Sequence, residues 1–175
     1  LLPFDLPRMQ RDTQFVSKSF AQFCQADVFC IHANLHDTMP YPSKDAINQA
    51  FFKKIKPNTI LINAARGGIV NEDALLNHSK PLIYCTDVYC NEPHINPQIV
   101  KYASICTPHV AGHSIEAKSR AVTYLYTKIC ERFDIPHCHT FKHTTHSGYQ
   151  PESLEAMLSA YHPIHETNEL KQAHA

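Results

Sequence analysis

The stretch Ile60-Leu61-Ile62-Asn63-Ala64-Ala65-Arg66-Gly67-Gly68-Ile69-Val70 decides the fold. Its first three residues are apolar and mostly β-branched, which is typical of a strand buried on both faces. Small residues end the strand, and the glycine pair at 67–68 permits a sharp turn without side chains that block a ligand. Arg66 is therefore expected at the carboxyl end of a buried strand, where open α/β sheets bind their ligands.

The chemistry of Arg66 favours a carboxylate ligand, because its planar guanidinium makes two parallel charge-assisted hydrogen bonds. The alternative is an arginine in a surface salt bridge, but the small residues on both sides favour a binding role. Asn71 stands where a helix N-cap belongs, and Glu72 and Asp73 follow in the first turn, where negative charge suits the helix dipole.

Strand-like and helix-like segments alternate on both sides of this stretch. Strands are predicted at 1–4 (the end of one), 27–32, 60–62, 82–86 and 104–107, and helices at 17–25, 45–55, 72–77, 97–102 and 114–133. Such alternation predicts an α/β fold with a doubly wound, Rossmann-like parallel sheet, incomplete at its N-terminal side.

The composition changes after residue 134. Prolines and histidines become frequent, and little hydrophobic periodicity remains. We therefore predict a partial nucleotide-binding domain over 1–133 and a short irregular C-terminal extension over 134–175. One helix is expected at 151–160, and 161–175 is expected to be polar and mobile.

Composition excludes several classes of protein. The 175 residues carry equal numbers of acidic and basic side chains, which argues against a general nucleic-acid binder. No run of about 18 apolar residues predicts a membrane span. The chain has seven cysteines, an odd number, and no C-x-x-C pair, which indicates reduced thiols in a cytoplasmic protein. The segment Leu1–Asp5 is typical of the interior of a fold rather than of a leader peptide.

Three predicted strand ends carry charged groups: Arg66, Glu92 and His109. In a parallel sheet these ends share one edge, so the three side chains are expected to converge. A glutamate bonded to a histidine favours the protonated imidazole, which makes the histidine a general acid/base near neutral pH. Together with an arginine that holds a carboxylate, this set suits hydride transfer from a hydroxy acid to a cofactor. The alternative is that Glu92 caps a turn and His109 is an ordinary surface histidine.

Asp5 ends the first predicted strand, where an acidic residue can accept both hydroxyls of an adenosine ribose and repel a 2′-phosphate. The alternative is a helix cap or a turn. Arg8 is close to Asp5 in the sequence, and its positive charge weakens the predicted preference for NAD over NADP.

The segments Asn63–Asn71, Asp87-Val88 with Glu92-Pro93, and Thr107–Gly112 resemble the D-isomer-specific 2-hydroxyacid dehydrogenase family, over about residues 1–133. The resemblance implies that Arg66 binds the substrate carboxylate, that His109 is the proton donor and acceptor, and that Glu92 orients it. It also implies a cytoplasmic homodimer that oxidises a phosphorylated 2-hydroxy acid.

The resemblance further implies NAD as the cofactor and no metal. The residues expected to line its site, mostly through their backbone, are Asp5, Ala33, Ala64, Ala65, Arg66, Asp87 and Gly112. His113 stands where the most similar members have a substrate-binding tyrosine, and it is expected to contact the substrate phosphate.

One family feature is absent from this sequence. Its four glycines, at 67, 68, 112 and 148, cannot form the G-x-G-x-x-G loop that binds a pyrophosphate. The family also begins with a substrate-binding domain. We therefore expect a fragment that binds NAD weakly, has no turnover alone and self-associates.

Three alternatives remain open. The first is another 2-hydroxyacid dehydrogenase, for glycerate or phosphoglycerate. The second is a non-catalytic binding or interaction module derived from such an enzyme. The third is a Zn²⁺ site, because Cys and His at short spacings can ligate zinc, in the segment that holds His137, Cys138, His139, His143 and His146.

Overall fold

A computed structural model describes residues 1–112, 115–136, 153, 155 and 161–175. The chain divides into two compact units. One holds residues 1–109 together with 163–175, and the other holds 110–162. Each unit is described by itself.

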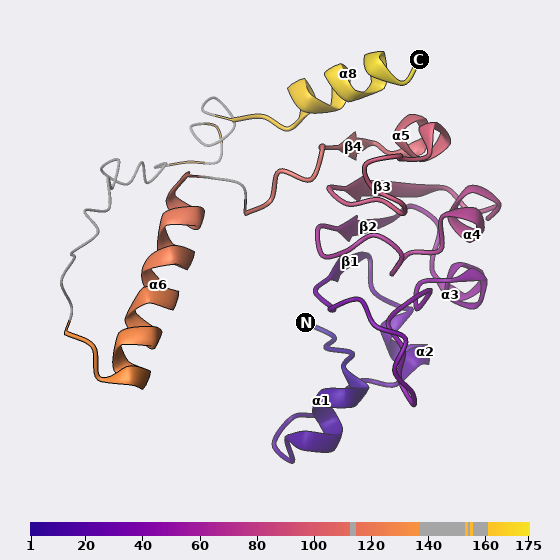
Figure 1. The fold of residues 1–175 in the computed structure, drawn as a ribbon. Helices are drawn as coiled ribbons and strands as arrows, with labels where there is room; N and C mark the ends of the chain where they lie inside the picture. The colour runs from indigo at the N-terminus through magenta and orange to yellow at the C-terminus, as the bar shows by residue number, and fades with distance from the viewer. Residues whose placement is uncertain (113–114, 137–152, 154, 156–160) are drawn as a thin grey trace. The chain divides into compact units, whose positions relative to one another are not determined.

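The first unit is built on a four-stranded parallel sheet in the order β1-β2-β3-β4 (Figure 1). The strands are β1 (Val28–Ile31), β2 (Thr59–Asn63), β3 (Leu82–Thr86) and β4 (Ile105–Cys106). Helices connect consecutive strands, as parallel pairing requires. The sheet and its flanking helices confirm the predicted α/β class.

Three connecting helices pack along one face of the sheet (Figure 1): α3 (Gln49–Lys54), α4 (Glu72–Leu76) and α5 (Pro97–Tyr102). Their buried side chains meet the alternate residues of the strands that point to this face. The main core residues are Phe51, Phe52, Leu75, Ile99 and Val100 from the helices, and Phe29, Leu61, Tyr84 and Cys106 from the strands. On the opposite face Ile60, Ile62 and Cys85 are only half-buried.

Asparagine caps start all three of these helices. The side chains of Asn48, Asn71 and Asn96 accept hydrogen bonds from the backbone N–H groups of Ala50, Ala74 and Gln98. Each bond satisfies one of the free amides at a helix start. The cap predicted at Asn71 is confirmed, with Glu72 and Asp73 in the first turn.

The predicted strand end at 1–4 is wrong. These residues form no strand, and Asp5 caps the helix α1 (Leu6–Arg11), followed by the short helix α2 (Phe20–Phe23). Pro3 has no N–H to give to a ladder, and its carbonyl accepts from Lys18 N at 2.8 Å. Phe4 is held instead by stacking on Phe23, with ring centroids 4.8 Å apart.

The prediction of a mobile segment at 161–175 is also wrong. Helix α8 (Ile164–Ala173) packs against β4. The Thr167 hydroxyl accepts from Cys106 N at 3.0 Å and lies 2.9 Å from Cys106 O, while Lys171 donates to Ala103 O. Polar side chains of α8 thus satisfy backbone groups at the sheet edge, which explains why a polar segment is ordered.

The second unit holds the helix α6 (Ile115–Phe133). It carries several exposed apolar side chains, Val122, Tyr124, Leu125, Ile129 and Phe133. Nowhere in the described ranges is a helix both long and apolar enough to cross a membrane. The residues described also contain no cluster of metal-ligating side chains, whereas the histidine-rich segment 137–146 and most of the helix predicted at 151–160 lie outside them.

Candidate active site at the carboxyl ends of the strands

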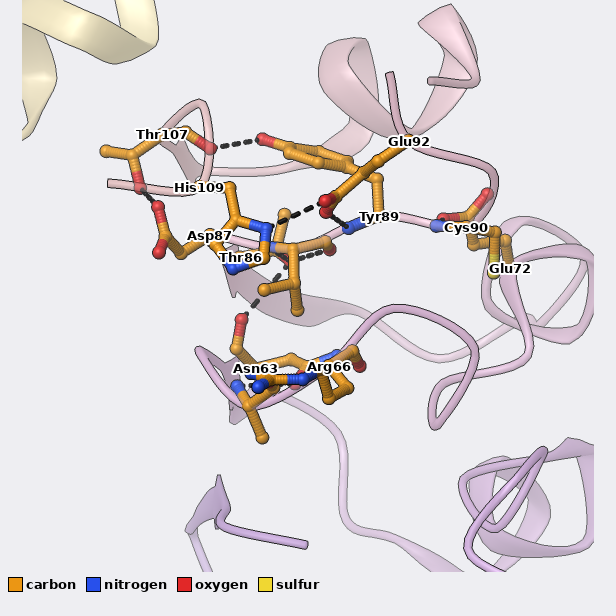
Figure 2. Close-up of polar contacts among 12 residues, drawn as sticks. Asn63, Arg66, Glu72, Thr86, Asp87, Tyr89, Cys90, Glu92, Thr107 and His109 are labelled. Carbon is orange, nitrogen blue, oxygen red and sulfur yellow. Dashed lines mark hydrogen bonds and ion pairs between the residues drawn. The ribbon is translucent and has the colours of Figure 1, made fainter. Parts of the chain in front are cut away.

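The parallel register brings the charged strand ends to one edge. Asn63 of β2 pairs with Thr86 of β3, and Thr86 pairs with Cys106 of β4. The loops that leave these three residues carry Arg66, Glu92 and His109. Figure 2 shows the three side chains in one neighbourhood at this edge. Of the three, His109 and Glu92 are in hydrogen-bond contact, and Arg66 follows the neighbouring strand β2.

The buried amide of Asn63 shapes the turn that presents Arg66. Asn63 Nδ2 donates to Arg66 O at 3.1 Å, and Ala65 N donates to Asn63 Oδ1 at 3.2 Å. The guanidinium is exposed and donates to Ala65 O at 2.7 Å. Within the described part of the chain it has no carboxylate at ion-pair distance, so its other N–H groups are available to an anionic ligand.

Two glycines let this turn lie close to the next loop. A Cβ atom on Gly67 would be 1.8 Å from Tyr89 O, so only glycine fits there. Gly68 has a φ of +79°, in the left-handed region where glycine has no steric cost. The pair thus fixes the path of the Arg66 loop against the loop after β3.

His109 and Glu92 form a hydrogen-bonded pair. His109 Nδ1 lies 2.7 Å from Glu92 Oε2 (Figure 2). Because a carboxylate only accepts, Nδ1 carries the proton, and Nε2 of the neutral ring is the atom that can receive one. His109 has a φ of 55°, uncommon for a residue other than glycine, and such strained positions are frequent at functional sites.

Asp87 lies buried beneath these groups, directly after β3. Thr107 donates its hydroxyl hydrogen to Asp87 Oδ1, and the Thr86 hydroxyl donates to Val88 O at 2.7 Å. Only 6% of Asp87 is exposed. A carboxylate held there offers acceptor oxygens beside the loops that carry Arg66 and His109.

Neighbouring titratable groups do not provide a nucleophile. Burial raises the pKa of the Cys90 thiol to about 11, and Glu72 nearby adds to the effect. Burial likewise raises the pKa of Glu72, whose carboxyl accepts from Cys90 N at 2.8 Å. Cys90 therefore stays a thiol at neutral pH. Cys24, Cys30, Cys85, Cys90, Cys106 and Cys130 form no disulfide.

The other predicted ligand-binding residues fall into two groups. Ala33, Ala64 and Ala65 lie in the loops that leave β1 and β2 at the same edge. Asp5 lies on the β1 side of the sheet, because the neighbouring Phe4 stacks on Phe23, which packs against Phe29 of β1. One carboxylate oxygen of Asp5 accepts a hydrogen bond from Arg8 N. Its capping role is the alternative considered from the sequence. Gly112 belongs to the second unit, and His113 lies outside the described residues.

Comparison with known proteins identifies the family of this chain. Residues 7–111 match the family described as D-isomer specific 2-hydroxyacid dehydrogenase, NAD binding domain. The chain belongs to this family. An erythronate-4-phosphate dehydrogenase from Legionella pneumophila is 47% identical over 172 residues, which are 97% of this chain and 49% of that protein. One from Coxiella burnetii is 37% identical over 131 residues, covering 75% of this chain and 36% of the relative.

A solved structure of a related dehydrogenase has a similar fold. The NAD-dependent formate dehydrogenase from Staphylococcus aureus, in complex with NAD, aligns with a TM-score of 0.56 and 28% identity over 74% of this chain and 40% of the other. The match supports the Rossmann-like fold of this dehydrogenase family. The chain spans about half the length of the curated relatives it matches.

The sequence did not predict the buried residues that hold the loops of the site in place. Tyr89 is buried and its hydroxyl donates to Thr107 O at 2.9 Å, while Thr107 holds Asp87. No motif or spacing signals a contact between a side chain and the backbone of another strand end. Only the tertiary structure reveals these residues.

Proposed function

We propose that this chain is the NAD-binding and catalytic part of an enzyme that oxidises 4-phospho-D-erythronate to 2-oxo-3-hydroxy-4-phosphobutanoate in the cytoplasm, a step of pyridoxal 5′-phosphate biosynthesis. The observation that carries the proposal is the hydrogen-bonded pair of His109 and Glu92 at the strand edge from which Arg66 presents its guanidinium. The names of the relatives support the choice of substrate.

The residues of this chain have separate roles in that reaction. Arg66 binds the substrate carboxylate through paired hydrogen bonds. His109 Nε2 accepts the proton of the C2 hydroxyl as the C2 hydrogen leaves with its electron pair. Glu92, bonded to Nδ1, holds the ring and stabilises the imidazolium that results. The imidazolium then returns its proton to water.

The cofactor supplies the hydride acceptor when it is bound. The small residues Ala33, Ala64 and Ala65 leave the backbone of the strand ends open to a ligand, and the buried carboxylate of Asp87 provides acceptors beneath it. We assign Asp5 to the adenosine ribose. Ala33, Ala64, Ala65 and Asp87 therefore fit the nicotinamide half of NAD, and Asp5 is assigned to the adenosine half.

The phosphate contact and the oligomer belong to the same proposal. We assign the substrate phosphate to His113, whose imidazole can donate to a phosphate oxygen. We also expect the complete enzyme to be a homodimer that acts on a small phosphorylated hydroxy acid and binds neither nucleic acid nor a membrane.

A chimera provides the direct test. Residues of this chain replace the matching half of the Legionella pneumophila relative, which is similar over 172 residues. We expect the chimera to oxidise 4-phosphoerythronate with a higher kcat/KM than erythronate, glycerate or 3-phosphoglycerate. A preference for glycerate or phosphoglycerate would reassign the substrate. The His109→Asn chimera is the negative control, and equal turnover by both would refute the catalytic assignment.

A further inference from the structure

We infer that Tyr89 is a positioning residue. It holds the loops that carry Arg66, Glu92 and His109 at the spacing that the proposed reaction requires. The inference rests on the proposed function, because it assigns to Tyr89 the support of that same site. Tyr89 lies in the loop after β3 and is 4% exposed. Different atoms of Tyr89 contact Glu92 in its own loop, Thr107 ahead of His109, and Gly67 after Arg66. Figure 2 shows it beside Glu92, with its ring running toward Thr107.

The first contact fixes Glu92. Tyr89 N donates to Glu92 Oε1 at 2.8 Å, while Glu92 Oε2 accepts from His109 Nδ1 at 2.7 Å. The two carboxylate oxygens therefore have different donors, and the backbone of Tyr89 sets the plane in which the second oxygen meets the imidazole.

The second contact fixes the segment that carries His109. The Tyr89 hydroxyl donates to Thr107 O at 2.9 Å, and the same oxygen accepts from His109 N at 3.0 Å. Thr107 O is thus held by the backbone of the histidine and by a tyrosine from the neighbouring strand end. Burial raises the pKa of Tyr89, so its hydroxyl remains a donor throughout the neutral range.

The third contact places the Arg66 loop. The carbonyl of Tyr89 faces Gly67 so closely that a Cβ atom there would be 1.8 Å from Tyr89 O. The backbone of the Arg66 turn therefore rests directly on Tyr89. One residue sets the spacing among the three functional side chains, and its hydroxyl is the part that acts on His109.

A purely structural role would require only the aromatic ring in the core. Tyr89→Phe keeps that ring and removes the hydroxyl. Tyr102→Phe is the matched control, because Tyr102 also uses its hydroxyl in one hydrogen bond, 2.8 Å from His78 Nε2 and on a helix that carries none of the three functional residues.

The readout is the ratio of the Nδ1–H to the Nε2–H tautomer of His109, measured by NMR in the ¹⁵N-histidine-labelled chain at a pH where the ring is neutral. The His109→Gln spectrum assigns the signal among the thirteen histidines. We expect Tyr89→Phe to lower this ratio about three- to tenfold, the scale of one hydrogen bond. Tyr102→Phe should leave it unchanged.

A comparison with Glu92→Ala distinguishes failure of the role of Tyr89 from failure of the His109–Glu92 pair. Glu92→Ala should lower the ratio more than Tyr89→Phe does, because it removes the acceptor itself. If Glu92→Ala lowers the ratio and Tyr89→Phe does not, the positioning role is refuted while the catalytic pair stands. If Glu92→Ala has no effect, the pair does not exist, and the proposed function and the role of Tyr89 are both refuted.

A pair of unnatural residues keeps the test decisive if Tyr89→Phe does not fold. p-Aminophenylalanine at 89 retains a donor, and p-methylphenylalanine fills the same space without one. We expect the amine to preserve the tautomer ratio and the methyl to lower it. Equal ratios in these two variants would show that the donor has no role.

Discussion

His109 Nδ1 lies 2.7 Å from Glu92 Oε2, although the two residues are 17 positions apart and follow different strands. The side chains are 38% and 32% exposed. A pair this exposed contributes little to folding, because solvent screens its charges. In the proposed reaction the pair serves the chemistry, since it engages Nδ1 and leaves Nε2 for the substrate hydroxyl.

Replacement of His109 by Asn tests the acid/base role. In the chimeric enzyme we expect kcat to fall at least about a hundredfold, the scale of general acid/base catalysis. The measurement is NADH formation at saturating substrate. His174→Asn is the control, because His174 is exposed at the end of α8. Similar kcat values for the two variants would remove His109 from the mechanism.

Glu92→Gln tests the charge on the partner of His109. The amide no longer stabilises the imidazolium, so we expect the pH dependence of kcat/KM to move to lower pH. Glu131→Gln is the control, because it neutralises an exposed carboxylate paired with Lys128 at 2.6 Å. Superimposable profiles for wild type and Glu92→Gln would contradict the catalytic pair.

The part of this site that was predictable rests on strand register. Apolar runs at 60–62 and 82–86 identify neighbouring parallel strands, and parallel strands end at one edge. Residues placed shortly after those ends, such as Arg66 and Glu92, are then expected at the same edge of the sheet. Helix caps such as Asn71 were predictable as well, because their interactions are local.

The features that were not predictable depend on contacts distant in sequence. Nothing in the polar sequence of α8 indicates that Thr167 satisfies the backbone of Cys106, 61 residues away. The same holds for Tyr89 and Thr107. At the N-terminus, local apolar character suggested a strand, but Pro3 and the aromatic packing of Phe4 determine the structure.

Asn63→Ala tests the turn that presents Arg66. The Asn63 amide is buried and bonds both Arg66 O and Ala65 N, so its removal leaves two backbone groups unsatisfied. We expect the free energy of unfolding to fall by about 1–3 kcal/mol in urea denaturation. Asn77→Ala, which removes an exposed amide bonded to Asp73 O, should cost less than about 0.5 kcal/mol. Equal losses would argue against a special role for Asn63.

His78 gives the fold a defined pH dependence. Burial lowers its pKa below the ordinary value of 6.5, and Lys80 adds to the effect, so the native state favours the neutral ring. The unfolded chain binds the proton more readily, and His78 therefore lowers the free energy of unfolding as pH falls below about 6.5.

His78→Phe keeps a ring on Phe52, whose centroid is 5.0 Å from that of His78, but cannot titrate. We expect urea denaturation at pH 7.5 and 5.0 to show a smaller acid loss of stability in this variant than in wild type. His174→Gln should retain the wild-type dependence. A His78→Phe variant with the full acid loss would place the effect on other groups.

Gly67→Ala and Gly68→Ala separate close approach from backbone strain. At 68 a Cβ atom has room, with Leu35 Cδ1 at 3.6 Å, but the φ of +79° costs an alanine about 1–2 kcal/mol. At 67 the Cβ atom would be 1.8 Å from a backbone oxygen that no rotamer change can move. We expect Gly67→Ala to lose at least about 3 kcal/mol in urea denaturation, more than Gly68→Ala, because the Arg66 turn must separate from Tyr89. The reverse order of stability would mean that the two loops are not in contact.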